Sequence, residues 1–221
     1  MVCFYRRIET NPQSQAISEM IISLITPSFN LNKRPTQTLA FSEEELQEFL
    51  SLGAMIKKKK KKQYFMVLHY LTITIECPVL LMKDGTYRII WPSFKLPNRP
   101  YPVFVYLYAA ALYLSSGESM RKTAEKVIKF FGLETFSHTT ISRFLCKIYQ
   151  TLPELIRYGA QVLNEWGSTV FQVIRRKHWD ETQHQRAKQL CNLIAPALRS
   201  PPGFGCWLAQ KYWQDSSNFL V

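Results

Sequence analysis

The sequence predicts a mainly α-helical protein, in which a helix-turn-helix bundle follows a small β-hairpin region and a weakly specified helical N-terminus. Three observations predict this fold class. Apolar residues recur with the helical period of about 3.6 residues from Val103 almost to the C-terminus. Strand patterns are limited to residues 65–76, whose Leu-Thr-Ile-Thr-Ile core alternates with period two, and to residues 87–91. The composition, 47% hydrophobic and 20% charged over 221 residues, is that of a folded globular protein.

The chain divides into four segments with different patterns. They are a helical appendage at 1–56, a lysine run with a hairpin and a proline-rich linker at 57–100, a helix-turn-helix module at 101–157, and a helical C-terminal region at 158–221. In the first segment the patterns predict helices over 12–25 and 42–52. Ser42 and Glu45 form a capping box for the second of these helices, because each side chain satisfies a free backbone N–H group.

The second segment combines a charge run with strand patterns. Lys57–Lys62 carries half of the net charge of +12, and we expect a solvated, flexible stretch that attracts phosphate without sequence preference. Residues 65–76 and 87–91 form two strands, and the turn residues Lys-Asp-Gly-Thr between them predict a β-hairpin. Four prolines between Trp91 and Pro102 exclude a helix, so an extended linker is expected there.

The third segment contains three consecutive helical patterns. The first extends from Val103 to Leu114 and ends at a Ser-Ser-Gly breaker. It is apolar throughout, which is typical of a buried helix. The second begins near Ser119, a favourable capping residue, and extends to Phe131 with Gly132 as its stop signal. The third begins after another capping serine and continues past residue 150.

The start of the third helix is the candidate for contact with DNA. Ile141 and Ile148 lie on the face that packs against the second helix, which leaves the polar residues of the first turns exposed. In helix-turn-helix proteins these positions enter the major groove, where arginine pairs with guanine and hydroxyls reach bases or phosphates. The candidate DNA-binding residues are Arg121, Lys122, Ser137, His138, Thr139, Thr140, Ser142 and Arg143.

Charge and periodicity leave a second interpretation open. The pI near 9.5 favours an anionic partner, duplex DNA above all, and Arg175–Trp179 is a further basic cluster that can follow a phosphate backbone. Amphipathic helices with exposed lysine and arginine also occur in helical protein–protein interaction modules. Trp207 and Trp213 would then form the contact surface of such a module. Otherwise these tryptophans close the helical core or a contact between two copies of the chain.

Two apolar stretches were tested as membrane spans. Residues 64–82 contain His69, Glu76 and Pro78, and their alternation favours a strand. Residues 101–114 are fewer than the ~20 that cross a bilayer. A small membrane-anchored protein is therefore the least favoured alternative, and no membrane partner is expected.

No pattern in the sequence predicts catalysis, a metal site or a cofactor. The five cysteines are widely spaced and form no Cys-x-x-Cys pair. His178 and His184 lack the i, i+4 spacing of metal ligands on a helix, and Asp84, Asp180 and Asp215 lie outside any strand-rich nuclease core. We expect no catalytic residue, no cofactor and no small-molecule substrate. The chain has no recognisable secretory signal, so a cytoplasmic, nucleoid-associated location is expected.

Several short motifs follow one another within residues 91–157. They are Pro-Ser-Phe-x-Leu-Pro, an alanine-rich helix, Arg-Lys-Thr-Ala and Ser-His-Thr-Thr-Ile-Ser-Arg-Phe. In this order they resemble the segment that follows a zinc ribbon in bacterial insertion-sequence transposases and related transposon-encoded proteins. The resemblance covers about a third of the chain. It implies binding to transposon DNA, with Arg121, Lys122 and residues 137–143 at the duplex.

The resemblance also has departures. Zinc ribbons need two Cys-x-x-Cys pairs, because tetrahedral zinc takes four ligands. Glu76-Cys77-Pro78 resembles the first pair, but Leu80 stands where its second cysteine would be, and the second pair is absent. The resemblance therefore implies a degenerate ribbon in a transposase accessory or truncated transposase without catalysis of its own. A frame change within the run of lysine codons would explain why the resemblance begins only after that run.

Overall fold

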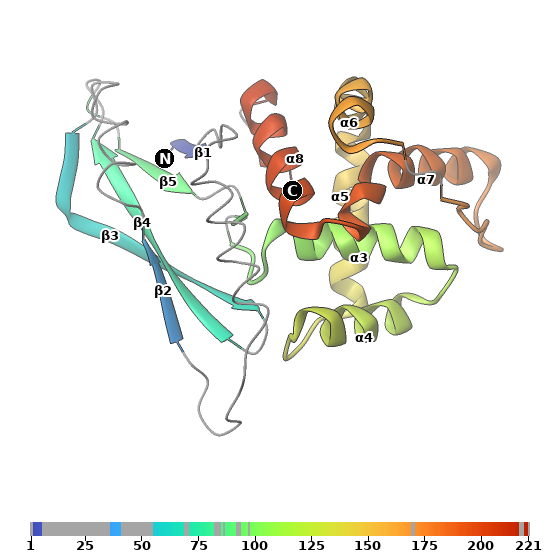
Figure 1. Ribbon diagram of the computed structural model, residues 1–221, viewed down its shortest axis with the longest axis horizontal. Coiled ribbons are helices and arrows are strands. Elements are labelled where there is room, and N and C mark those ends of the chain that lie inside the picture. The colour runs from blue at the N-terminus through green and yellow to red at the C-terminus, as the bar shows by residue number, and fades with distance from the viewer. Residues whose placement is uncertain are drawn as a thin grey trace.

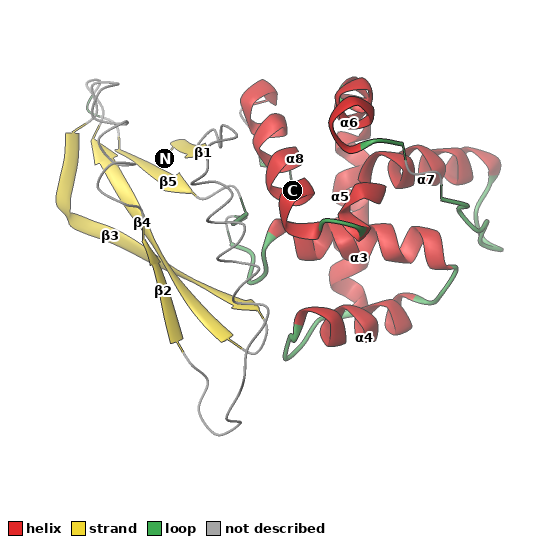
Figure 2. Ribbon diagram, viewed as in Figure 1, coloured by secondary structure: helices red, strands yellow, loops and turns green. Residues whose placement is uncertain are grey.

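The computed structural model of the chain describes residues 2–5, 36–40, 55–68, 71–81, 85, 87–91, 94–96, 98–168, 171–216 and 219–220. Strands lie on one side of the molecule and helices on the other (Figures 1 and 2). The mainly α-helical fold class is confirmed, because helices account for most of residues 98–220. The helices predicted over 12–25 and 42–52 lie outside the described residues.

Six helices and one 3-10 turn form the helical side of the described chain. In order they are α3 (Val103–Ser116), α4 (Met120–Phe131), α5 (His138–Arg157), α6 (Gly159–Trp166), α7 (Glu181–Ile194), η1 (Ala195–Leu198) and α8 (Pro201–Ser216). The predicted capping residues have the expected roles. Ser119 and Ser137 accept hydrogen bonds from backbone N–H groups three residues on, and Gly132 ends α4 in the left-handed conformation.

The strands are β1 (Val2–Tyr5), β2 (Thr36–Ala40), β3 (Met55–Leu68), β4 (Leu71–Leu81) and β5 (Tyr87–Trp91). Their order in the sheet is β1-β5-β4-β2, and β3 also pairs with β4. β4 and β5 are antiparallel, as the predicted hairpin requires, but the residues of β4 that pair are Val79–Leu81, which lie beyond the predicted first strand. Gly85 in the turn has a φ of 78°, a value that favours glycine.

Two sequence predictions about the sheet are wrong. Residues 65–76 do not form one strand, because they span the end of β3 and the start of β4, which pair with Leu68 opposite Leu71. Strand-forming residues continue on both sides of this reversal, and no glycine or proline marks it. The run Lys57–Lys62, where a flexible stretch was expected, lies within strand β3, and a register shift between Ile56 and Lys61 interrupts the pairing of β3 with β4.

The proline-rich stretch before α3 is a folded corner, which corrects the prediction of an extended linker. Phe94 and Leu96 are buried, and the N–H of Val103 donates to the carbonyl of Phe94 at 2.8 Å. Lys95 is also buried, and its ammonium donates to the carbonyl oxygens of Leu96 and Arg99. Burial lowers the pKa of Lys95 to about 8. The prolines exclude a helix, but they do not prevent the apolar residues between them from packing into the core.

Helix α3 is the centre of the helical side. It packs against α4, α5, α7 and α8, and ten of its 14 residues are buried. A helix that is apolar on every side needs such surroundings, and the prediction of a buried helix is therefore confirmed. Among the described residues no helix combines the length and hydrophobicity that a membrane crossing requires.

The C-terminal helices close over the other side of α3. Trp207 on α8 stacks on Phe204 and meets Trp166 of α6 edge to face, with ring centroids 5.8 and 6.2 Å apart. Of the three roles expected for Trp207, the ring contacts with Phe204 and Trp166 support closure of the core. Asp180 forms a capping box with Gln183 at the start of α7. This pairing gives Asp180 a structural role.

The cysteines differ sharply in exposure, which predicts their reactivity. Cys146 is exposed, whereas Cys77, Cys191 and Cys206 are buried. Burial also raises the pKa of Cys191 to about 11, so its reactive thiolate is scarce at neutral pH. In a Cys3→Ser background, N-ethylmaleimide should modify Cys146 far faster than the other three, as measured by peptide mass spectrometry. All four should react equally in guanidinium, and rapid labelling of Cys191 in the folded protein would contradict the packing of α7.

Candidate nucleic-acid interface

Helix α4 and the start of α5 lie together at one end of the helical side. Figure 1 shows α4 on the opposite side of α3 from α6, with α5 crossing behind α3 between them. The apolar residues of α4 face this junction, where Val127 and Phe131 are buried. Ile141 and Ile148 of α5 are buried in the same core, as their spacing predicts.

The turn between α4 and α5 is held by its own packing. Leu133 and Phe136 are buried, and the Phe136 ring lies 5.4 Å from the ring of Tyr101. The Tyr101 hydroxyl donates to the carbonyl oxygen of Thr135. The N–H of Leu133 donates to the carbonyl of Ile128 at 3.0 Å, which completes the end of α4. These contacts fix the start of α5 relative to α4.

Of the eight sequence-predicted residues, two lie in the first turn of α4 and six lie at the start of α5. Arg121 and Lys122 are exposed in the first turn of α4, and Arg143 is exposed in the second turn of α5. Within the described residues, no acidic side chain pairs with any of these three. They are therefore positive charges that remain accessible to an anionic partner.

The polar residues at the start of α5 fall into two groups. The Ser137 hydroxyl accepts from the N–H of Thr140 at 3.2 Å and lies 2.7 Å from the Thr139 hydroxyl. These hydroxyls already serve the cap, so only their remaining lone pairs or protons can reach a ligand. His138 is exposed and Ser142 is half-buried, and neither belongs to the cap. The side chains best placed to meet a partner are thus those of His138, Ser142 and Arg143.

The other charges on α4 are partly compensated. The Lys126 ammonium lies 2.8 Å from the carboxylate of Glu118, which precedes the helix. Such an exposed pair contributes about 0–1 kcal/mol to stability and is weakened by salt. Lys129 and Glu125 are both exposed on the same helix. The uncompensated positive charge of α4 therefore lies mainly at its start.

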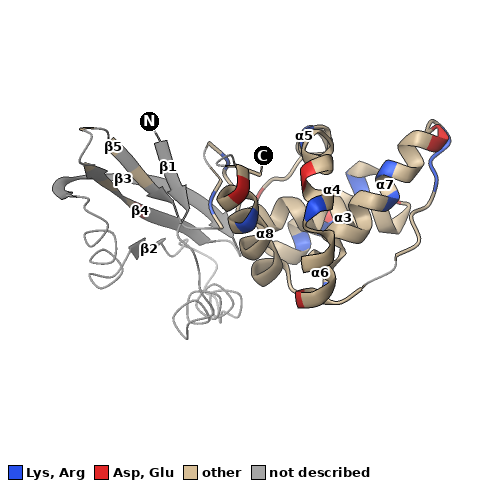
Figure 3. Cartoon of the chain, turned by 90° about the horizontal axis from the view of Figure 1, so that it is seen from above, with Lys and Arg blue, Asp and Glu red and all other residues tan. Residues whose placement is uncertain are grey.

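The basic cluster Arg175–Trp179 lies in the loop before α7. Figure 3 shows this loop at the edge of the molecule farthest from the sheet, next to the acidic start of α7. Arg175 pairs with Glu181 at 3.1 Å. The Arg176 side chain points inward and donates hydrogen bonds to backbone carbonyls of Tyr113 and Glu118. No pattern in the sequence predicts these bonds. Lys177 and His178 remain exposed.

Metal sites and similar proteins give no further indication of function. Among the residues that the structure describes, no cluster of three or more His, Cys, Asp or Glu side chains could hold a metal ion. Cys77 is fully buried in β4, and His184 is buried against the ring of Trp179. Comparison with protein-family models gives no match, and no curated protein matches the chain.

Proposed function

We propose that the protein binds duplex DNA with the α4–α5 end of its helical side, as a transposase-like accessory or truncated protein without catalysis of its own. One observation carries this proposal. Three accessible cations, Arg121, Lys122 and Arg143, lie at the starts of two helices whose relative position is fixed by a packed turn. A buried first helix, α3, supports both of them.

The chemistry of this end suits a duplex. The start of α5 offers Arg143, whose planar guanidinium matches the O6 and N7 acceptors of guanine. Arg121 and Lys122 are suited to phosphates, which fix orientation and carry no sequence information. The positive ends of the α4 and α5 dipoles add to the attraction for an anion. In this proposal α5 contacts the bases, and α4 contacts the phosphate backbone of the DNA.

The sequence motifs support a narrower target. Arg-Lys-Thr-Ala opens α4, and Ser-His-Thr-Thr-Ile-Ser-Arg opens α5, so both motifs of the transposase resemblance lie at the proposed interface. We therefore propose DNA of a mobile element as the target and the nucleoid as the location. Catalysis, where it is needed, would come from another protein.

Salt dependence tests the proposal. We expect the full chain to bind a labelled duplex at about 50 mM salt, with log K falling linearly against log[salt] by about 0.9 per phosphate neutralised. The double variant Arg121→Ala/Lys122→Ala should reduce this slope by about two. Fluorescence anisotropy over a salt series measures both quantities.

A matched variant controls for net charge. Arg186→Ala/Lys188→Ala also removes two positive charges, but from α7. We expect it to leave the slope within about 0.5 of that of the unsubstituted chain, because non-contacting charges release no counterions. Absence of binding at low salt would contradict the proposed function, as would an equal effect of both double variants.

A further inference from the structure

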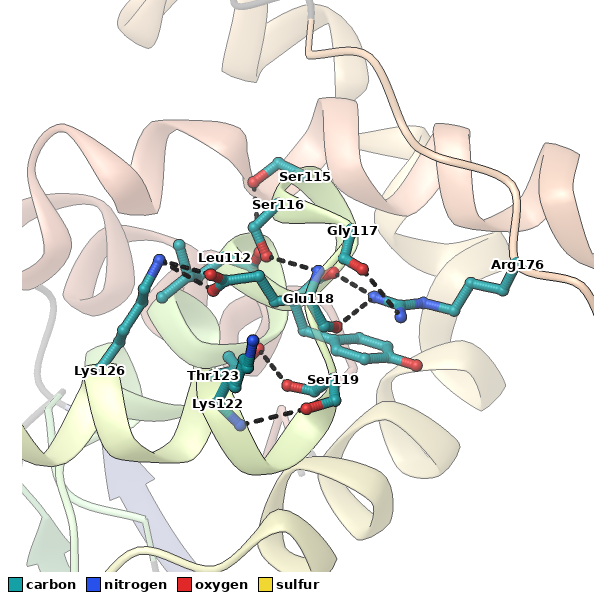
Figure 4. Close-up of polar contacts among 11 residues, drawn as sticks. Leu112, Ser115, Ser116, Gly117, Glu118, Ser119, Lys122, Thr123, Lys126 and Arg176 are labelled. Atoms are coloured by element: carbon teal, nitrogen blue, oxygen red, sulfur yellow. Dashed lines mark hydrogen bonds and ion pairs between the residues drawn. The ribbon is translucent and has the colours of Figure 1, made fainter.

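A loop from the C-terminal region crosses the turn between α3 and α4. Arg176 extends from this loop, residues 171–180, to three backbone carbonyls at the turn (Figure 4). Its guanidinium donates to the carbonyl oxygens of Tyr113 at 2.9 Å, Glu118 at 2.8 Å and Gly117 at 3.5 Å. A single side chain therefore joins the last turn of α3 to the residues that lead into α4.

The end of α3 lacks a cation of its own. The last carbonyls of a helix have no partner inside the helix, and a cation there also interacts favourably with the helix dipole. No basic residue occurs in the last turn of α3, and Gly117 follows it in the left-handed conformation at φ 68°. Arg176 supplies both the hydrogen bonds and the positive charge from a distant part of the chain.

Apolar contacts hold the loop in place. The guanidinium carbon of Arg176 lies 3.9 Å from the ring centroid of Tyr113 and 5.7 Å from that of Trp179. Ile174 covers Gly117 so closely that a Cβ at this glycine would lie 2.6 Å from the Ile174 Cδ1 atom. Trp179 in turn packs against His184 of α7. The loop is thus anchored to α7 and to the turn.

Glu118 connects Arg176 with α4. Its carbonyl accepts from Arg176, and its carboxylate lies 2.8 Å from the ammonium of Lys126 on α4. The next residue, Ser119, caps α4 by accepting from the N–H of Lys122. The contacts of Arg176 therefore end at Glu118, one residue before the cap of α4, and Arg121 lies in the first turn after that cap.

We propose that Arg176 is a positioning residue that fixes where α4 begins and so orients Arg121 and Lys122. The segment 171–180 then acts as a strap that couples α7 to the α3–α4 turn. The effect on DNA rests on the proposed function, whereas the effect on the turn does not depend on it. Arg176 itself is half-buried and engaged with backbone carbonyls, so it is not a phosphate ligand.

Amide hydrogen exchange of the full chain tests the strap without DNA. Arg176→Ala should speed exchange of the amides between Gly117 and Thr123 by about ten-fold or more, because hydrogen bonds from a charged donor are lost. Arg176→Lys should give the same pattern, since an ammonium cannot replace the planar fork. Lys177→Ala is the matched control: it removes an exposed charge from the same loop and should leave these amides unchanged.

The outcomes separate the strap from the proposed function. Unchanged exchange at the turn in both Arg176 variants overturns the positioning role. If Arg176→Ala speeds exchange in every helix, the result for Arg176→Lys is used instead. Faster exchange in this variant that is limited to the turn supports the positioning role, and unchanged exchange at the turn overturns it. In the DNA-binding experiment, Arg176→Ala should weaken binding several-fold without changing the slope of log K against log[salt]. A slope lower by about one would show that Arg176 contacts a phosphate directly, and it would overturn the positioning role. No binding by the unsubstituted chain would overturn the proposed function and leave the result at the turn standing.

Discussion

Replacing Gly205 by alanine is expected to lower the free energy of unfolding by about 2–3 kcal/mol. Helix α8 approaches α3 so closely here that the added Cβ would lie 2.6 Å from the Cβ and 2.8 Å from the Cα of Phe104. Phe104 is fully buried at the centre of the core. Because the clash involves backbone atoms, the two helices must move apart and lose contacts along their whole interface.

Gly159→Ala is the matched control, since it also adds a methyl group at a helical glycine. The nearest atom to a Cβ there is the Leu193 Cδ2 atom at 3.6 Å, an ordinary contact. Alanine is the better helix former by up to about 1 kcal/mol, so this variant should be neutral or more stable. Urea denaturation followed by circular dichroism measures both. Equal stability of the two variants would contradict the close packing of α8 on α3.

The second large effect concerns DNA recognition. Arg143→Ala should weaken binding to the preferred duplex by about 1–3 kcal/mol and make the choice of sequence less strict, because a base contact is lost. Lys122→Ala should weaken binding to every duplex by a similar factor, because a phosphate contact carries no sequence information. Selection from a random duplex library, followed by anisotropy on selected and random sequences, measures both effects.

The informative quantity in this experiment is the affinity for the selected duplex divided by the affinity for duplexes of random sequence. It should fall for Arg143→Ala and stay constant for Lys122→Ala. Arg157→Ala serves as the control, because this exposed arginine lies at the opposite end of α5. A ratio that changes equally for Arg143→Ala and Arg157→Ala would remove the basis for assigning base contact to the start of α5.

Local signals in the sequence were sufficient for both ends of α4, for the start of α5 and for the turn of one hairpin. Ser119, Gly132 and Ser137 each act on backbone groups within a few residues, so their effects can be predicted without knowing the fold. The β4–β5 hairpin is similarly marked by its turn residues. No such turn residues mark the reversal between β3 and β4, and its position depends on the pairing of these two strands.

Contacts between distant residues were not predictable. Arg176 lies in a basic cluster that looks solvated in the sequence, yet it bonds to carbonyls of Tyr113 and Glu118 far earlier in the chain. The docking of Phe94 likewise depends on the core that receives it. At the candidate site the sequence identified the polar residues, but not the hydrogen bonds that some of them already make within the protein. That Ser137 and Thr139 share a hydrogen bond follows from the geometry of the cap.

The location of DNA on the protein tests the central proposal most directly. Backbone amide chemical shifts of the isotope-labelled full chain can be followed by NMR as duplex DNA is added. We expect the largest changes at residues 119–122 and 137–143, with no comparable change along α7, residues 181–194. Changes confined to α7 or to the C-terminal helix, or none at a duplex concentration that saturates anisotropy, would contradict binding by the α4–α5 end.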